Sequence, residues 1–521
     1  MTKGRIFGAA VLVAGLTILS RIAGFARILV FNSSVGTTQL GDAYQAANTI
    51  PNIIFELVAG GALASLVVPL LAGRDKATVE RTVGALLTWV VLILAPIAVL
   101  VAVLAHPLVA LLTSGKPAPV IDAGADMLRV FAPQLPLYGV GIVLTGALQM
   151  YRRFAWPVIA PLLSSLTVMA VYIAFGVVAG RGVALADVTG AHLLLLSGGT
   201  TLAVAVLSLC LVAPVGRLGL RIRPTVRLDV GAIATLKPLV VAGIVTVGTQ
   251  QLVIGLAINL VSYGQSDGVI VVYSLAQTIF LLPWAVLAVP VATTTYPALA
   301  ERGAAGDRAG FAAALAPAVR AVILLSCLGA AALIVLARPV AVLLAAASSH
   351  PPAVGPLADG IAWFGPGLLG YGVFALLSRA LYAGGNAYPA ALATAAGWGA
   401  AAVAAVSLAT ALPVGHRVAA VAAANSIGML VLGAALLVAV RRRAGGEALA
   451  GAVRTASVCV VAAAAATFAG LFVRSHLTTP GAGGAVVQGM LCGVVVAMVF
   501  LAGAAVADRG TLQRLIGRRD G

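Results

Sequence analysis

Long apolar segments separated by short polar breaks run through almost the whole chain. Each segment is long enough to cross the apolar core of a bilayer, which takes about 20 helical residues. The runs are continuous rather than alternating, which favours helices over the strands of a barrel. The pattern therefore predicts an all-α polytopic membrane protein with about 14 transmembrane helices. These spans are expected near 6–32, 40–72, 83–105, 124–150, 156–179, 190–214, 233–262, 269–298, 316–337, 357–383, 388–412, 417–440, 450–473 and 484–506.

The positive charges indicate how the spans are oriented. If the N-terminus lies inside, most of the 32 lysines and arginines fall in the inner breaks, and few fall in the outer ones. This asymmetry predicts a multi-pass protein of the bacterial inner membrane with an even number of spans and both termini in the cytoplasm.

Composition excludes several other classes of protein. Apolar residues make up 61% of the chain and charged residues 9%, whereas a soluble domain is about one quarter charged. The net charge of +17 is of the kind seen in nucleic-acid-binding proteins. However, the basic residues lie between apolar runs and lack interleaved aromatics, so we expect contact with membrane lipids and no nucleic acid. The histidines are scattered, and no catalytic, metal-binding or cofactor-binding motif is present. We therefore expect no enzyme activity, no metal and no cofactor.

Two halves of the chain repeat each other. For example, the segment from Pro69 to Arg74 corresponds to that from Pro297 to Arg302, an offset of 228 residues. Because six spans separate the copies, both halves enter the membrane in the same direction, as in a parallel transporter repeat. The predicted organisation is an N-lobe of six spans, a basic cytoplasmic linker, a C-lobe of six spans, and a C-terminal helix pair with a short basic tail. Their ranges are 1–214, 215–231, 232–440 and 441–521.

The first span contains polar groups that are costly at mid-membrane, so we expect them to face a cavity or a partner. Ser20, Gly24 and Arg27 share one helical face, and Arg21 lies beside it. Gly24 is a candidate for close helix approach or bending. A simple alternative is that one arginine extends to the membrane interface.

The second span carries a polar stripe with a spacing of 3, 4, 3 and 4 residues, formed by Asp42, Gln45, Thr49, Asn52 and Glu56. We expect its two carboxylates, Asp42 and Glu56, to pair with Arg21 and Arg27 around a hydrated chamber. The alternative is a stripe sealed in helix packing.

Bending of the second span is predicted at Pro51, with a second flexible point at Gly60 and Gly61. The corresponding spans of the second half offer hydrogen bonds rather than charges, through Gln250, Gln277 and Thr278.

Several of these motifs resemble the opening two spans of the MurJ/MviN lipid II flippases of the MOP exporter superfamily. They are the segments Ser20–Arg27, Gly41–Tyr44, Ile50–Asn52, Gly60–Ala62 and Val68–Pro69. The resemblance implies 14 helices, two six-helix lobes and a final pair that helps to form a groove for lipid tails. It also implies transport of lipid II, the undecaprenyl-pyrophosphate-linked peptidoglycan precursor, from the inner to the outer leaflet.

The resemblance places Arg21, Arg27, Asp42 and Asn52 at the substrate, and we add Glu56 from the polar stripe. The chain departs from the family pattern at Ile28, where an acidic residue is common, and at Phe55 and Thr278, near which the family often has basic residues.

Alternating access of the two lobes is the mechanism that a parallel repeat around a polar chamber favours. Two alternatives remain open at this stage. One is a MOP-type exporter of another lipid-linked saccharide or of a drug. The other is a non-transporting membrane scaffold that recruits cell-wall synthesis or division proteins.

Overall fold

The computed structural model describes residues 3–58, 71, 75–227, 230–264, 267–385, 387–477 and 481–507. This part of the chain is helical and contains no β-strand. It divides into two compact units, each described separately below. The first is Met1–Val271 with Ala347–Pro351, and the second is Val272–Ala346 with Pro352–Gly521.

The expected polytopic membrane architecture is confirmed. Among the described residues, 11 helices are long and apolar enough to cross a membrane. Two further pairs of helices, bent by 40° and 45°, raise the count to 13 if each pair forms one span. The predicted second span at 40–72 extends beyond the described residues, and so does the proposed flexible point at Gly60 and Gly61.

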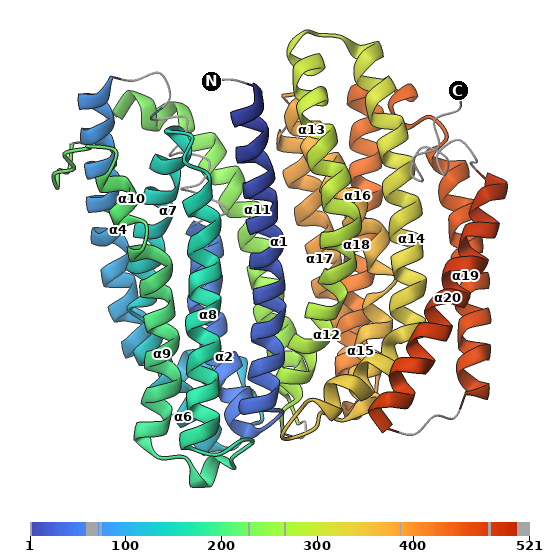
Figure 1. The fold of residues 1–521 in the computed structure, drawn as a ribbon, viewed down its shortest axis with the longest axis horizontal. Helices are drawn as coiled ribbons and strands as arrows, with labels where there is room; N and C mark the ends of the chain where they lie inside the picture. The colour runs from blue at the N-terminus through green and yellow to red at the C-terminus, as the bar shows by residue number, and fades with distance from the viewer. Residues whose placement is uncertain are drawn as a thin grey trace. The chain divides into compact units, whose positions relative to one another are not determined.

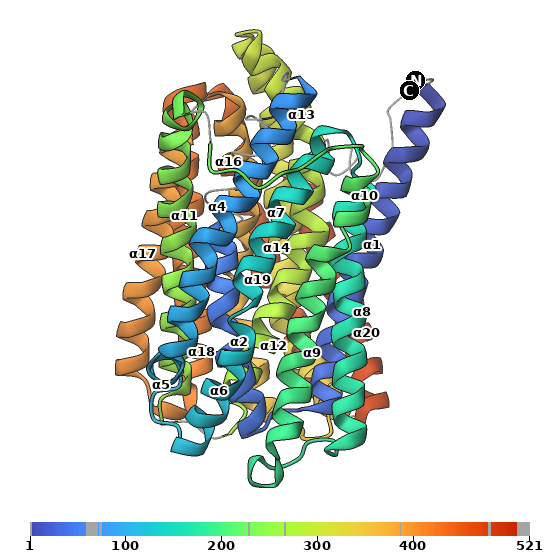
Figure 2. The same ribbon diagram turned by 90° about the vertical axis from the view of Figure 1, so that its left-hand side faces the viewer.

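The first unit contains the N-terminal helices. They are α1 (Lys3–Ser34), α2 (Gln39–Glu56), α4 (Lys76–Val103), α5 (Ala105–Leu112), α6 (Ala118–Phe131), α7 (Gln134–Met150), α8 (Ala155–Val178), α9 (Gly190–Leu209), α10 (Val212–Gly216) and α11 (Val230–Ser262), with a short 3₁₀ turn at Leu185–Asp187. Helix α8 packs between α1 and α9 (Figure 1), and α4 packs along α7 (Figure 2). The first residues of α12 (Val269–Pro283) also belong to this unit.

The second unit contains the remaining helices. They are α13 (Val289–Ala304), α14 (Arg308–Ala346), α15 (Val354–Phe364), α16 (Gly367–Ala383), α17 (Ala387–Ala411), α18 (Arg417–Ala444), α19 (Ala452–His476) and α20 (Gly481–Ala507), with 3₁₀ turns at Val414–His416 and Glu447–Leu449. A π-helical turn at Trp284–Ala288 joins α12 to α13. Such turns mark places where a helix changes direction.

Polar side chains fix where two helices of the first unit begin. The Thr38 hydroxyl accepts a hydrogen bond from the Gly41 N–H at 3.1 Å, which caps α2. A carboxylate oxygen of Asp75 accepts from the Thr78 N–H at 3.2 Å and caps α4. Hydrogen bonds from the Thr78 hydroxyl and then from its N–H hold the pKa of Asp75 below its ordinary value. Asp75 is therefore an ionised cap at neutral pH.

The C-terminal helix pair, α19 and α20, contacts α14 beside a proline. Pro339 has no N–H, so the carbonyl of Val335 lacks the helical donor it would otherwise receive. The guanidinium of Arg474 on α19 donates to that carbonyl at 3.2 Å. Helices α19 and α20 also pack on each other and on α14 (Figure 1). The arginine thus satisfies a backbone group that the proline leaves open.

Candidate functional site

Asp42 is fully enclosed in the first unit, with 0% of its surface exposed. Its carboxylate lies 2.8 Å from the Lys116 ammonium, which is also buried. It accepts further hydrogen bonds from the backbone N–H groups of Gly268 at 2.9 Å, Ile270 at 2.8 Å and Val271 at 3.3 Å. The N–H groups at the start of a helix lack helical acceptors and favour a negative charge. Asp42 therefore ties α2 and the α5–α6 loop to the start of α12.

The backbone around this tie requires glycine at residue 268. Gly268 has a φ of +77°, a conformation that residues with a side chain rarely adopt. A Cβ atom there would also lie 2.2 Å from the carbonyl oxygen of Thr37. The close approach lets the Gly268 N–H reach Asp42. Nearby, the Thr37 hydroxyl donates to the His350 carbonyl at 2.6 Å, and the Gln39 amide donates to Asp267 at 3.1 Å.

A second set of side chains, polar and aromatic, lies near the C-terminal end of α2. The Tyr138 hydroxyl on α7 donates to the Asn52 side-chain oxygen at 3.4 Å. The rings of Phe55 and Tyr138 have centroids 4.4 Å apart. Asn52 and Glu56 are exposed, and Tyr138 is half-buried. Asn52 and Phe55 therefore form one cluster with Tyr138, and Glu56 follows them as the last residue of α2.

Arg27 on α1 is half-buried. Within the described ranges no carboxylate forms an ion pair with Arg27 or Arg21, and Arg21 is exposed. The expected pairing of these arginines with Asp42 is therefore replaced by the pairing of Asp42 with Lys116.

The other predicted residues of the first two spans are placed as follows. Ser20 and Gln45 are half-buried, and the Thr49 hydroxyl donates to the Gln45 carbonyl at 2.7 Å within α2. Pro51 is buried inside α2. A methyl group at Gly24 would meet no described atom within 4 Å, so close helix approach does not explain this glycine.

The polar residues predicted in the second half are also half-buried. Gln250 lies on α11, and Gln277 and Thr278 lie on α12. The Thr278 hydroxyl donates to the Ser274 carbonyl of its own helix at 2.8 Å. Its hydrogen is therefore engaged within the helix, whereas its oxygen can still accept.

A pocket of about 270 Å³ adjoins the cluster at the end of α2. Phe55 and Tyr138 line it together with Thr145, Gln149 and Ser208 and with mostly apolar residues of α7, α8 and α9. The Ser208 hydroxyl is buried and has no hydrogen-bond partner among the described residues. An apolar space with a few polar groups is typical of a ligand site.

Neither Lys116 nor Tyr138 was expected at a site from the sequence. Lys116 lies in a predicted outer loop, where positive residues usually contact water. Tyr138 lies in an apolar run, where an aromatic residue normally packs in a core. No motif marks either residue, and only the fold brings them to Asp42 and Asn52.

Tyr44 holds the interior of the first unit together. Its hydroxyl lies 2.8 Å from that of Tyr172 and 2.9 Å from that of Thr200. Its ring packs against Phe31 and Phe131 at centroid distances of 5.2 and 5.7 Å. This network joins α2 to α8 and α9 and supports the helix that carries Asn52 and Glu56.

Replacing Tyr44 with phenylalanine is expected to lower the free energy of unfolding by about 1–2 kcal/mol, because two buried hydroxyls lose a partner. Thermal unfolding of the purified protein in detergent, followed by circular dichroism, measures the change. Tyr388→Phe is the control, since Tyr388 is 69% exposed. Equal midpoints for the two variants would contradict a stabilising role for the network.

Within the part of the chain that the structure describes, no three His, Cys, Asp or Glu side chains are grouped so that they could hold a metal ion. The groups described around the C-terminal part of α2 are the half-buried Arg27 guanidinium, the Glu56 carboxylate, the hydrogen-bonding groups of Asn52 and Tyr138, and a mostly apolar pocket. Such a set can bind a polar or anionic group beside an apolar one.

Comparison with known protein families gives a match over most of the chain. A family model described as lipid II flippase MurJ matches residues 31–491. A lipid II flippase MurJ of Burkholderia cenocepacia is 27% identical over 390 residues, which are 73% of each chain. A probable lipid II flippase MurJ of Rhizobium meliloti is 27% identical over 341 residues, or 64% of this chain and 62% of the relative.

Solved structures show the same fold. A lipid II flippase MurJ in an inward closed conformation superposes with a TM-score of 0.77 at 17% identity and covers 98% of this chain and 100% of that one. An inward-facing multidrug resistance MATE family transporter of the MOP superfamily has a TM-score of 0.65 at 14% identity. It covers 84% of this chain and 98% of its own. At these identities the likeness establishes a transporter fold and does not identify a substrate.

Proposed function

The chain belongs to the lipid II flippase MurJ family, and on that premise we propose that it moves lipid II from the inner to the outer leaflet of the bacterial cytoplasmic membrane. The relatives that it matches carry that activity in their names. The orientation with both termini in the cytoplasm is part of the proposal and rests on the distribution of positive charge.

The observation that supports this proposal most directly is the half-buried Arg27. A guanidinium inside a membrane span is costly unless it has an anionic partner. Asp42 is engaged with Lys116, and no other carboxylate forms an ion pair with Arg27 in the described ranges. Lipid II supplies a pyrophosphate, whose oxygens suit the planar donors of an arginine. Arg27 is therefore proposed to bind the pyrophosphate. The exposed Arg21 is proposed to attract the pyrophosphate as it approaches Arg27.

Asn52, Glu56 and Tyr138 are assigned to the sugar and peptide part of the substrate. Their amide, carboxylate and hydroxyl groups provide both donors and acceptors. The neighbouring pocket of about 270 Å³ gives room for an apolar group beside them. The headgroup is proposed to cross along a polar lining. Its members are Ser20, Gln45, Thr49, Gln250, Gln277 and Thr278. The polyprenyl tail stays in lipid, because its burial in a polar chamber would be unfavourable.

Asp42 is assigned a positioning role instead of direct contact with the substrate. Its carboxylate already receives the Lys116 ammonium and three backbone N–H groups. It fixes the first turn of α12, the helix that carries Gln277 and Thr278. Alternating access requires helices that move as rigid bodies about pliable points. Gly24 and Pro51 are proposed as two of these points.

A MOP-type exporter of another lipid-linked saccharide is the second candidate, since the fold also matches a MATE transporter. The two candidates predict different complementation: a lipid II flippase rescues a strain that lacks its own lipid II flippase, and an exporter of another lipid-linked saccharide does not. A third possibility, a scaffold for cell-wall enzymes, predicts rescue that does not depend on Arg27.

The proposal is tested by complementation of a strain depleted of its own lipid II flippase, with lipid II scored in the outer leaflet. We expect growth to be restored together with outward lipid II. Failure of both readouts, with the chain present in the membrane at the level of the native flippase, would overturn the proposal. Growth without outward lipid II would favour the scaffold.

A further inference from the structure

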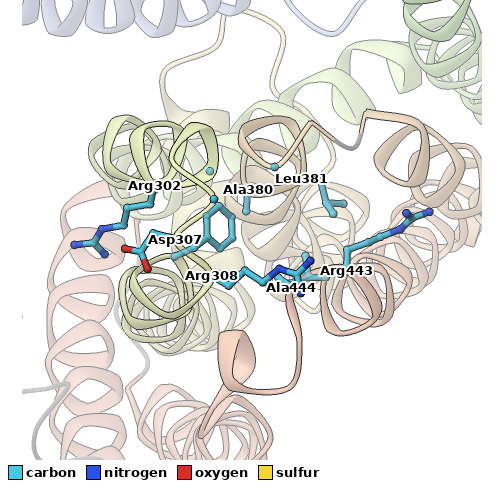
Figure 3. Close-up of a pocket in the computed structure, with 12 residues that line it drawn as sticks. Arg302, Asp307, Arg308, Ala380, Leu381, Arg443 and Ala444 are labelled. Carbon is cyan, nitrogen blue, oxygen red and sulfur yellow. The ribbon is translucent and has the colours of Figure 1, made fainter.

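A second pocket, of about 220 Å³, lies in the second unit, where the ends of four helices meet. The C-terminal ends of α13, α16 and α18 and the N-terminal end of α14 form its walls. Figure 3 shows Arg302 at one end of the pocket and Arg443 at the other, with Asp307 and Arg308 between them. None of the residues assigned above to lipid II lines this pocket.

Positive charge dominates the rim of this pocket. Three arginines and one aspartate line it. Asp307 is engaged with the backbone, because its carboxylate accepts the Gly310 N–H at 2.8 Å and caps α14. The Arg302 guanidinium donates to the Gly310 carbonyl. Arg308 and Arg443 are exposed and form no ion pair with any described carboxylate. Their donors are free to receive an anion from outside the chain.

The floor of the pocket is apolar. Phe311, Ala380, Leu381 and Val440 line it, and all four side chains are buried. A free inorganic anion would use the arginines alone and gain nothing from this floor. An amphiphile with a phosphate at its head and carbon chains behind it would use both. The combination of a cationic rim and an apolar floor thus selects a lipid over a soluble phosphate.

The position of the pocket along the chain fits a membrane surface. The α13–α14 break and the arginine run in the last turn of α18 both fall where the charge pattern predicts the cytoplasmic side. We propose that this pocket binds the phosphate headgroup of an anionic phospholipid of the inner leaflet. The bound headgroup would contact Arg308 on α14 and Arg443 on α18. It would neutralise positive charge that Asp307, the one carboxylate among the described lining residues, balances only in part. This site is independent of lipid II transport.

Binding is tested on the full chain in nanodiscs of phosphatidylcholine with increasing phosphatidylglycerol, by thermal unfolding and by native mass spectrometry of retained lipid. The pocket variant is Arg308→Gln with Arg443→Gln. The matched control is Arg441→Gln with Arg442→Gln, which removes the same charge from exposed arginines outside the pocket. Unfolding in pure phosphatidylcholine shows whether each variant is folded. Inorganic phosphate is titrated separately.

We expect the pocket variant to bind phosphatidylglycerol at least about 10-fold more weakly than the unmodified chain, because two charge-assisted contacts are lost. The control should lose less than about threefold, since its charges are screened by salt. An equal loss in both variants would show general attraction to an anionic surface and would overturn the proposal. Pocket-dependent binding of inorganic phosphate without phosphatidylglycerol binding would overturn the assignment to a lipid.

Discussion

Replacing Arg27 with alanine is expected to lower the rate of lipid II flipping by about 10- to 100-fold, because a charge-assisted contact with the pyrophosphate contributes about 1.5–3 kcal/mol. The protein should still fold, since Arg27 forms no ion pair with a described carboxylate. The measurement is outer-leaflet lipid II in the depleted strain, at matched membrane levels of each variant. Growth should fail when the native flippase is withdrawn.

Two further variants separate the roles of charge and shape at this position. Arg27→Lys keeps the charge but loses the planar pair of donors, so we expect partial activity. Arg129→Ala is the control, because Arg129 is exposed and pairs with Asp126 three residues earlier on α6. Wild-type flipping by Arg27→Ala would remove Arg27 from the site and shift attention to Arg21.

Asp42→Asn is expected to have the largest effect on stability, about 3–5 kcal/mol, because the Lys116 ammonium would lose the carboxylate that neutralises it in a buried place. The backbone N–H groups at the start of α12 would keep one weaker acceptor. Thermal unfolding in detergent should show a midpoint lower by about 5–10 °C. Flipping should fall with the amount of folded protein.

The double variant Asp42→Asn with Lys116→Met tests this cause directly. Removing both charges abolishes the desolvated cation, and such replacements are often neutral or stabilising. We expect the double variant to recover much of the midpoint that Asp42→Asn loses. If Lys116→Met instead lowers the unfolding midpoint further, by as much as it does alone, the two residues do not act as a pair. The stabilising effect of Asp42 would then come from its hydrogen bonds to the start of α12 and not from Lys116.

Much of this fold could be predicted because membrane helices obey a strong local rule. A span needs a run of apolar residues, and the sequence displays these runs one after another. The membrane helices and the family were both predictable, the latter from short motifs such as Ser20–Arg27. Burial of part of the second-span stripe could also be anticipated, since polar groups avoid lipid.

The partners of those polar groups could not be predicted from spacing. Asp42 and Lys116 are 74 residues apart (116 − 42), and nothing local marks them as a pair. Arg27 offered an equally plausible partner by charge alone. Tyr138 reaches Asn52 only because α7 packs beside α2. The choice among partners is a property of tertiary packing.

The contact between Arg474 and the Val335 carbonyl limits how this protein can be recombined with its relatives. Pro339 and Arg474 act as a matched set, one opening a backbone acceptor and the other filling it. A chimera that takes α19 and α20 from a relative with no donor at residue 474 would inherit an unsatisfied carbonyl at the junction. Grafts of the final helix pair should therefore be designed together with α14, as a single interchangeable module.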